Sequence, residues 1–238
     1  MLTLAVETAG RTGSVALVRD DEIVEQRFME PARGHGGLLL AEIDALLTGH
    51  NLKPADLDLF AACAGPGSFT GVRVGLATAK ALAWALGKPV AGLQSLEVLA
   101  HNALDPGIAP GIVAPVLDAR KREVYGSAYR LDGSALTLIV PAVVEPPSRF
   151  LARVTEAAGG AVVHWLGSGT AEYADVFGSS ALDGRIHAGI LGRLAARTYA
   201  EQGVEGLAAP VARYVRPSEA EVKFGPAPDH DPLAGVDG

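Results

Sequence analysis

The feature that most constrains the fold of this chain is a glycine-rich turn between an apolar strand and a long apolar helix. The turn reads GPGSFTGVR at residues 65–73, and it follows a predicted strand at residues 57–64. A predicted helix continues from it over residues 72–86. A strand, a glycine turn and a helix in this order make one α/β unit, and the free N–H groups at the start of such a helix can bind an anion.

The turn matches neither of the common phosphate-binding patterns. A Walker A loop requires Lys after its second glycine, whereas Gly71 is followed by Val72. A G-x-G-x-x-G motif would need its third glycine at Thr70. Two interpretations remain, an anion site and a tight turn in which glycine allows positive φ and close packing. The residues concerned are Gly65, Gly67, Ser68, Thr70 and Gly71.

The predicted helix at residues 72–86 is apolar on nearly every side. One stripe, which includes Leu76, Ala79 and Ala83, suits packing on a sheet. The opposite side carries small residues and a tryptophan where a solvated helix would carry charges, so either a later segment of the chain or another protein covers it. Trp and Arg are frequent anchors of protein interfaces. We therefore expect a partner-binding face made of Arg73, Ala77, Lys80, Ala81 and Trp84.

The chain divides into two halves with the same order of elements. Predicted strands at 2–7, 13–18 and 22–28 open the first half, and strands at 112–118, 123–129 and 136–140 open the second. In each half the first strand ends in an acid, Glu7 or Asp118. This similarity predicts duplicated α/β halves. We expect a first lobe at residues 1–105, a second at 106–224, and a disordered Pro- and Asp-rich tail at 225–238.

Charge and cysteine content restrict the function classes. The chain has 238 residues and a net charge of −7, which is poorly suited to tight autonomous binding of nucleic acid. We interpret the dense basic cluster at residues 120–122 as a solvated turn. The single cysteine, Cys63, lies in an apolar strand and is interpreted as a core residue. Because no signal segment or membrane-length apolar run is visible, we expect a cytoplasmic protein without a membrane partner.

Several runs of the chain resemble one known family. They are AVETA at residues 5–9, SVAL at 14–17, the glycine turn at 65–73, LDARKREVY at 117–125 and RYVRPSEAEVK at 213–223. Together they resemble the TsaB (YeaZ) proteins, paralogues of TsaD, over residues 1 to about 224. The resemblance implies the two-lobed α/β fold of actin, Hsp70 and sugar kinases, with duplicated ribonuclease-H-like halves.

The resemblance also implies a function. Proteins of this family take part in forming N6-threonylcarbamoyladenosine at position 37 of tRNAs that read codons beginning with A. The implied role is a non-catalytic partner of TsaD, which transfers the threonylcarbamoyl group, with the ATPase TsaE as a further partner. The first-lobe helices would form the heterodimer with TsaD, and a homodimer when the chain is alone. The tRNA would be the substrate of the complex.

The implied fold also places a nucleotide site. Phosphates would lie between the two acid-bearing hairpins and the adenosine on a glycine turn, at Glu7, Thr8, Asp118, Gly167 and Gly169. Glu7 stands where kinases of this fold carry Asp, and its bulk narrows the phosphate space. We therefore expect no cofactor for this chain alone, with ATP and metal belonging to partner proteins. An ATP-binding small-molecule kinase or ATPase is the alternative.

A metal site is not expected. TsaD-type proteins bind a metal through His-x-x-x-His on a first-lobe helix, two imidazoles one turn apart. Here His35 is followed four residues later by Leu39, and no two histidines lie three or four residues apart. A metalloprotease is therefore disfavoured, and we expect no catalytic residues in this chain.

Overall fold

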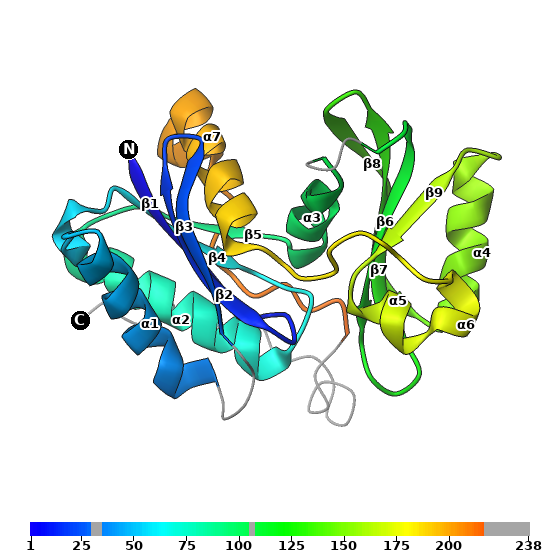
Figure 1. Cartoon of the computed structure of the whole chain (residues 1–238), viewed down its shortest axis with the longest axis horizontal. Coiled ribbons are helices and arrows are strands. Elements are labelled where there is room, and N and C mark those ends of the chain that lie inside the picture. Colours follow the sequence, from blue (N-terminus) through cyan, green and yellow to red (C-terminus); the bar gives the residue numbers. More distant parts are fainter. Residues whose placement is uncertain (30–34, 105–107, 217–238) are drawn as a thin grey trace, which may run out of the picture.

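The structure, a computed structural model, describes residues 1–29, 35–104 and 108–216. Two β-sheets with helices on their faces form two lobes joined near the middle of the chain (Figure 1). The predicted boundary at residue 106 falls among residues 105–107, and the predicted tail at 225–238 follows residue 216. Both lie outside the described residues.

The first sheet has the strand order β3-β2-β1-β4-β5. Antiparallel pairing joins β1 to β2 and β2 to β3, while β4 pairs in parallel with β1 and β5 with β4. The strands are β1 (Leu2–Glu7), β2 (Gly13–Arg19), β3 (Glu22–Met29), β4 (Leu59–Cys63) and β5 (Val90–Leu93). Parallel neighbours need a crossover helix, and the glycine turn and α2 (Phe69–Leu86) supply it between β4 and β5.

Helices cover both faces of this sheet (Figure 1). On one face lie α1 (His35–Gly49) and α2, and on the other lies α7 (Ala188–Gly206). Gly75 of α2 lies against Val6, and Gly192 of α7 lies against Ala5. Because neighbouring strand residues point to opposite faces, these contacts place the two helices on opposite sides of β1. A short 3₁₀ helix, η1 (Pro54–Asp56), precedes β4.

The second sheet has the order β8-β7-β6-β9 and repeats the first pattern. Its strands are β6 (Gly111–Asp118), β7 (Val124–Asp132), β8 (Ala135–Glu145) and β9 (Val163–Leu166). The first three are antiparallel neighbours and β9 pairs in parallel with β6, as β4 does with β1. This repetition confirms the two-lobed α/β fold with duplicated ribonuclease-H-like halves.

The second sheet also has two covered faces. Val113 and Leu117 of β6 face the larger core, which includes residues of α3 (Ser95–Ala100), and Ala114 and Val116 face the smaller core with Phe150. The remaining elements are α4 (Pro147–Ala158), α5 (Ser168–Glu172), α6 (Ala174–Phe177) and η2 (His101–Ala103). In Figure 1, α3 lies between the two sheets while α4 lies on the outer side of the second.

The last described part of the chain returns to the first lobe. Helix α7 packs on β1, β2, β3 and β4, although its sequence follows the second lobe. Residues 207–216 then run along the first lobe: Gly92 N–H donates to the Ala208 carbonyl (2.9 Å) and Arg213 N–H to the Ala64 carbonyl (2.7 Å). The sequence reading placed this helix with the second half. Helix α7 packs on the first sheet instead, where it covers the face opposite to α1 and α2.

Candidate functional site

The outer face of α2 is exposed over its whole length. Arg73, Ala77, Lys80, Ala81 and Trp84 are all exposed, at the spacing of one helix face. The Trp84 side chain is 88% exposed, although it is the largest apolar group on the helix. No segment within residues 1–29, 35–104 and 108–216 covers it. The opposite stripe, with Leu76, Ala79 and Ala83, is buried on the sheet.

Helix α1, beside α2, also exposes apolar side chains. The two helices contact each other and lie along the same side of the sheet (Figure 1). Leu38 is 45% exposed and Leu40 is 56% exposed, while Leu39 between them is buried. Three consecutive leucines cannot all face the core of a helix with 3.6 residues per turn, and this signal could have identified Leu38 and Leu40 from the sequence. Leu38 and Leu40 lie on opposite flanks of the buried Leu39, because successive residues are about 100° apart around a helix. We call Ala77, Ala81 and Trp84 the helical face.

The glycine turn is packed against the hairpin that follows β1. A side chain at Gly71 would place its Cβ 1.8 Å from the Thr8 carbonyl oxygen, and one at Gly67 would place it 2.4 Å from the Ala9 carbonyl oxygen. Ser68 N–H donates to that Ala9 carbonyl (2.8 Å), and the Thr8 hydroxyl donates to the Gly71 carbonyl (2.7 Å). Close backbone packing thus accounts for these two glycines.

The other turn residues fix the start of α2. The Ser68 hydroxyl caps the helix by accepting a hydrogen bond from Gly71 N–H (3.2 Å). Gly65 adopts φ +95° before a cis peptide bond to Pro66, and Thr70 is exposed.

Part of the predicted nucleotide site comes together in a cleft between the lobes. Two adjoining cavities of about 400 Å³ and 300 Å³ share four lining residues, Gly10, Arg11, Leu117 and Ser168. Asp118 lines the larger and Gly167 the smaller. Glu7, Thr8 and Gly169 do not line either cavity. Glu7 and Thr8 are buried beneath the first hairpin, and Gly169 packs on Val116.

The charges in this cleft are partly neutralised within the chain. The Asp118 carboxylate accepts a hydrogen bond from Arg120 N–H (2.9 Å) and pairs with the Arg120 guanidinium at 3.3 Å. Arg11 of the first lobe lies 3.5 Å from Glu172 of the second, an exposed pair that contributes little stability. The cleft therefore presents Arg11 from one side and an already paired Asp118 from the other.

Glu7 is buried in the middle of the first lobe. Its Oε1 accepts a hydrogen bond from Gly10 N–H (2.7 Å), and its Oε2 has no partner among the described residues. Burial raises the pKa of Glu7 to about 8, against the smaller opposing effect of the Gly10 and Ala9 hydrogen bonds. The side chain is therefore mostly protonated at neutral pH. A neutral carboxyl offers no charge to a cation that would accompany a nucleotide's phosphates.

The described residues show neither a metal-binding cluster nor a membrane-spanning helix. They contain no group of three or more His, Cys, Asp and Glu side chains arranged to hold a metal ion. The helices among them are all too short or too polar to cross a membrane. The side chain of His35, the histidine without a second one four residues on, lies outside the described part of the structure.

Known proteins similar to this chain were found by sequence and by structure. The family model described as "TsaD: tRNA N6-adenosine threonylcarbamoyltransferase" matches residues 29–224. The TsaB protein of Bacillus subtilis, described as a tRNA threonylcarbamoyladenosine biosynthesis protein, is 34% identical over 59% of this chain. That match spans 60% of the length of the B. subtilis protein.

Two solved structures resemble the whole described fold. The YeaZ structure from Pseudomonas aeruginosa superposes with a TM-score of 0.69 at 28% identity, over 87% of this chain and 98% of its own. A structure described as an uncharacterized protein with similarity to peptidase YEAZ from P. aeruginosa gives a TM-score of 0.73 at 27% identity, over 90% and 99%. The chain therefore belongs to the TsaD family, as a paralogue similar to the TsaB (YeaZ) proteins.

Proposed function

We propose that this chain is a non-catalytic partner of a TsaD-type transferase in the formation of N6-threonylcarbamoyladenosine at position 37 of tRNAs that read codons beginning with A. It would act in the cytoplasm, as a heterodimer with TsaD that the ATPase TsaE joins. The tRNA would be the substrate of the complex. Family membership supports the pathway, and the name of the B. subtilis relative supports the modification.

The observation that carries the partner role is the exposure of the helical face. Trp84 is 88% exposed, and the alanines at 77 and 81 beside it leave room for another helix to approach closely. Leu38 and Leu40 add apolar surface from α1. An uncovered apolar surface on two adjacent helices is typical of a binding site for another protein. Two such helices from each protein would pack as a four-helix bundle, with Trp84 as the anchor.

The acidic residues at and below the interlobe cleft support a non-catalytic role for this chain. Glu7, the acid that the resemblance implies for a phosphate site, is buried and lines neither cavity, and its pKa of about 8 keeps it mostly neutral at pH 7. The Asp118 carboxylate is paired with Arg120. On this proposal, ATP and metal are bound by the partner proteins. This chain holds TsaD in its competent state through the interface.

The test is to replace Trp84 by glutamate and to measure complex formation with TsaD of the same organism. Light scattering on size-exclusion fractions should show a one-to-one complex with the unmodified chain. Trp84→Glu should weaken that complex about 100-fold or more, because the partner would have to bury a carboxylate. The same substitution should dissociate a homodimer of the isolated chain.

The matched control is Val204→Glu, because Val204 is 60% exposed but lies on α7, away from the helical face. This variant should bind TsaD normally. If Trp84→Glu, folded as judged by circular dichroism, binds TsaD as well as the unmodified chain does, the proposed face is wrong. If the unmodified chain ignores TsaD, the partner role is wrong.

The second candidate is an ATP-binding kinase or ATPase of the actin-like fold. It is favoured by the position of Asp118 and Gly167, which line adjoining cavities between the lobes. Calorimetric titration of the isolated chain with ATP and Mg²⁺ decides between the candidates. Tight binding with turnover would establish the enzyme, and its absence at millimolar ATP would leave the partner role.

A further inference from the structure

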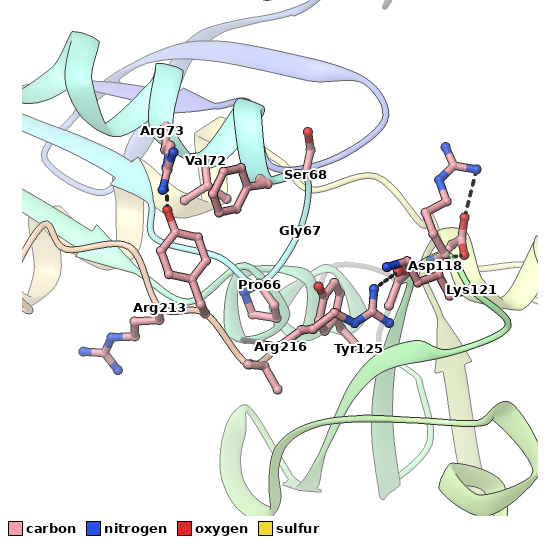
Figure 2. A pocket seen from close by; sticks show the side chains of 15 residues that line it. Pro66, Gly67, Ser68, Val72, Arg73, Asp118, Lys121, Tyr125, Arg213 and Arg216 are labelled. Atoms are coloured by element: carbon pink, nitrogen blue, oxygen red, sulfur yellow. Dashed lines mark hydrogen bonds and ion pairs between the residues drawn. The ribbon is translucent and has the colours of Figure 1, made fainter. Parts of the chain in front are cut away.

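A cavity of about 700 Å³ opens beside the start of α2, and the site described above does not use it (Figure 2). Three stretches far apart in sequence form its wall: residues 66–73, residues 118–125 from the end of β6 into β7, and residues 213–216. It touches the interlobe cleft only through Gly67, Ser68, Asp118 and Arg120. Its other lining residues, including Tyr214 and Arg216, do not line the cleft.

The charge of this cavity is opposite to that of the chain. The chain carries 27 acidic and 20 basic side chains, but the cavity wall contains one acid and five bases. The acid is Asp118, and the bases are Arg73, Arg120, Lys121, Arg213 and Arg216. Such a concentration of cations on an acidic protein creates a local attraction for anions. Arginine and lysine are the side chains that proteins use to bind phosphate groups.

The basic turn is held in an unfavourable backbone conformation. Arg120, Lys121 and Arg122 have φ values of +61°, +56° and +60°, and none of them is glycine. Three successive left-handed residues with side chains are costly, and such strain is concentrated at ligand-binding sites. The turn is fixed by two further contacts. The Arg216 guanidinium donates to the Ala119 carbonyl (2.6 Å) and also pairs with Glu123.

Three aromatic rings line the same cavity, and Figure 2 labels one of them, Tyr125. Phe69 is 44% exposed and Tyr214 is 42% exposed, with ring centres 5.1 Å apart. The Arg73 guanidinium lies 3.8 Å above the Phe69 ring and donates to the Tyr214 hydroxyl (2.8 Å). The Arg216 guanidinium lies 5.7 Å from the ring centre of Tyr125. Flat aromatic and guanidinium groups of this kind are surfaces on which nucleobases stack.

From the basic groups and the aromatic rings together, we infer that the cavity binds a nucleotide. Its phosphate would lie on the basic turn at residues 120–121 and its base against Phe69 and Tyr214. An isolated phosphate would make no use of the rings, and an uncharged aromatic ligand would make no use of the cations. The rest of the chain is acidic, so the contact is limited to one or a few nucleotides. The source is either a free nucleotide or a nucleotide within single-stranded RNA.

This inference does not depend on the partner role. Trp84 follows Phe69 by 15 positions on α2, which corresponds to about 22 Å along the helix axis. The cavity and the end of the helical face that carries Trp84 can therefore be altered separately. Absence of nucleotide binding would not contradict binding to TsaD, and absence of TsaD binding would not contradict nucleotide binding.

The experiment titrates the full chain with AMP, with a single-stranded RNA of about ten nucleotides, and with inorganic phosphate, in about 0.1 M salt. Lys121→Gly removes a cation while glycine accepts the left-handed conformation, so it should weaken binding about fivefold and flatten its salt dependence. Tyr214→Ala should weaken binding about tenfold or more, whereas Tyr214→Phe, which keeps the ring, should bind nearly as the unmodified chain does. Arg11→Glu, in the interlobe cleft, is the control and should have little effect.

Each outcome has a defined meaning. If AMP binds saturably, and Lys121→Gly and Tyr214→Ala weaken that binding as expected, the ligand is a free nucleotide. If only the RNA binds in this way, the ligand is a nucleotide within single-stranded RNA. Absence of saturable binding to both probes would overturn the inference. So would binding lost only in Arg11→Glu, which would place the ligand in the cleft, or phosphate binding as tightly as AMP, because the rings would then contribute nothing.

Discussion

At the scale of single residues, Glu7 shows how burial changes the chemistry of a side chain that the sequence placed correctly. It ends β1, as the sequence reading expected, but the neighbouring layers remove it from water and raise its pKa to about 8. The sequence alone could identify an acid at the end of the first strand. It could not show that the acid is neutral, because that depends on packing by α2 and by the first hairpin.

This burial predicts how stability depends on pH. Glu7 has a reference pKa of 4.5 and a folded-state pKa of about 8, so the unfolded chain releases its proton first as the pH rises. Between these values Glu7 should lower the free energy of unfolding by about 1.4 kcal/mol per pH unit, with no further loss above about pH 8. Glu7→Gln should match the unmodified chain near pH 4 and become increasingly more stable toward pH 8. Urea unfolding at several pH values checks this, and parallel curves for the two proteins would contradict it.

At the scale of elements, strands were more predictable than helices. The first hairpin and β6 follow the sequence reading closely, because their apolar runs end at clear turn signals. The predicted strand ended at Val140, whereas β8 continues through Pro141 to Glu145, because it is an edge strand and an edge tolerates proline. Helix α4 was missed. Its apolar residues Phe150, Val154 and Ala158 recur every four positions, a helical signal within a mostly polar run.

Helix α4 supplies the centre of the smaller core, so a change there should be felt by the whole second lobe. Phe150 is fully buried and stacks edge-to-face with Trp165 and Phe177. Phe150→Ala should lower the free energy of unfolding by about 3–5 kcal/mol through lost burial and a residual cavity. The matched control is Phe69→Ala, because Phe69 is 44% exposed and should cost much less. Equal losses in thermal or urea unfolding would contradict this view of the core.

The candidate sites differ in how far the sequence reveals them. The face of α2 with Ala77, Ala81 and Trp84 was visible from helical periodicity, because all its members lie on one element. The cavity beside Tyr214 was not visible, because residues about 50 and 90 positions apart meet there only in the folded chain. The packing of α7 on the first sheet could not be predicted from the sequence either. A helix's own pattern shows that it has a buried side but does not show which sheet it covers.

At the scale of the whole molecule, the segment after α7 connects the lobes. Residues 208 and 213 are hydrogen-bonded to the first lobe, and Arg216 contacts the Ala119 carbonyl and Glu123 of the second. Arg216→Ala should therefore loosen the turn at residues 119–123 and speed its backbone hydrogen exchange. Arg213→Ala is the control, because the exposed Arg213 guanidinium has no hydrogen bond or ion pair within the described residues. Equal exchange in both variants would contradict a connecting role for Arg216.

The return of α7 to the first sheet also determines the order in which the chain can fold during synthesis. The strands of the first lobe leave the ribosome early, but one face of their sheet stays uncovered until residues 188–206 have been made. The second sheet and α4 are encoded entirely between them, in residues 111–166. The smaller core, on one face of that sheet, is built mainly from this stretch and from Phe177, all of which precede α7 in the chain. The half that is synthesised first is therefore the last to be completed. Until then its bare sheet is the surface most in need of protection by a chaperone.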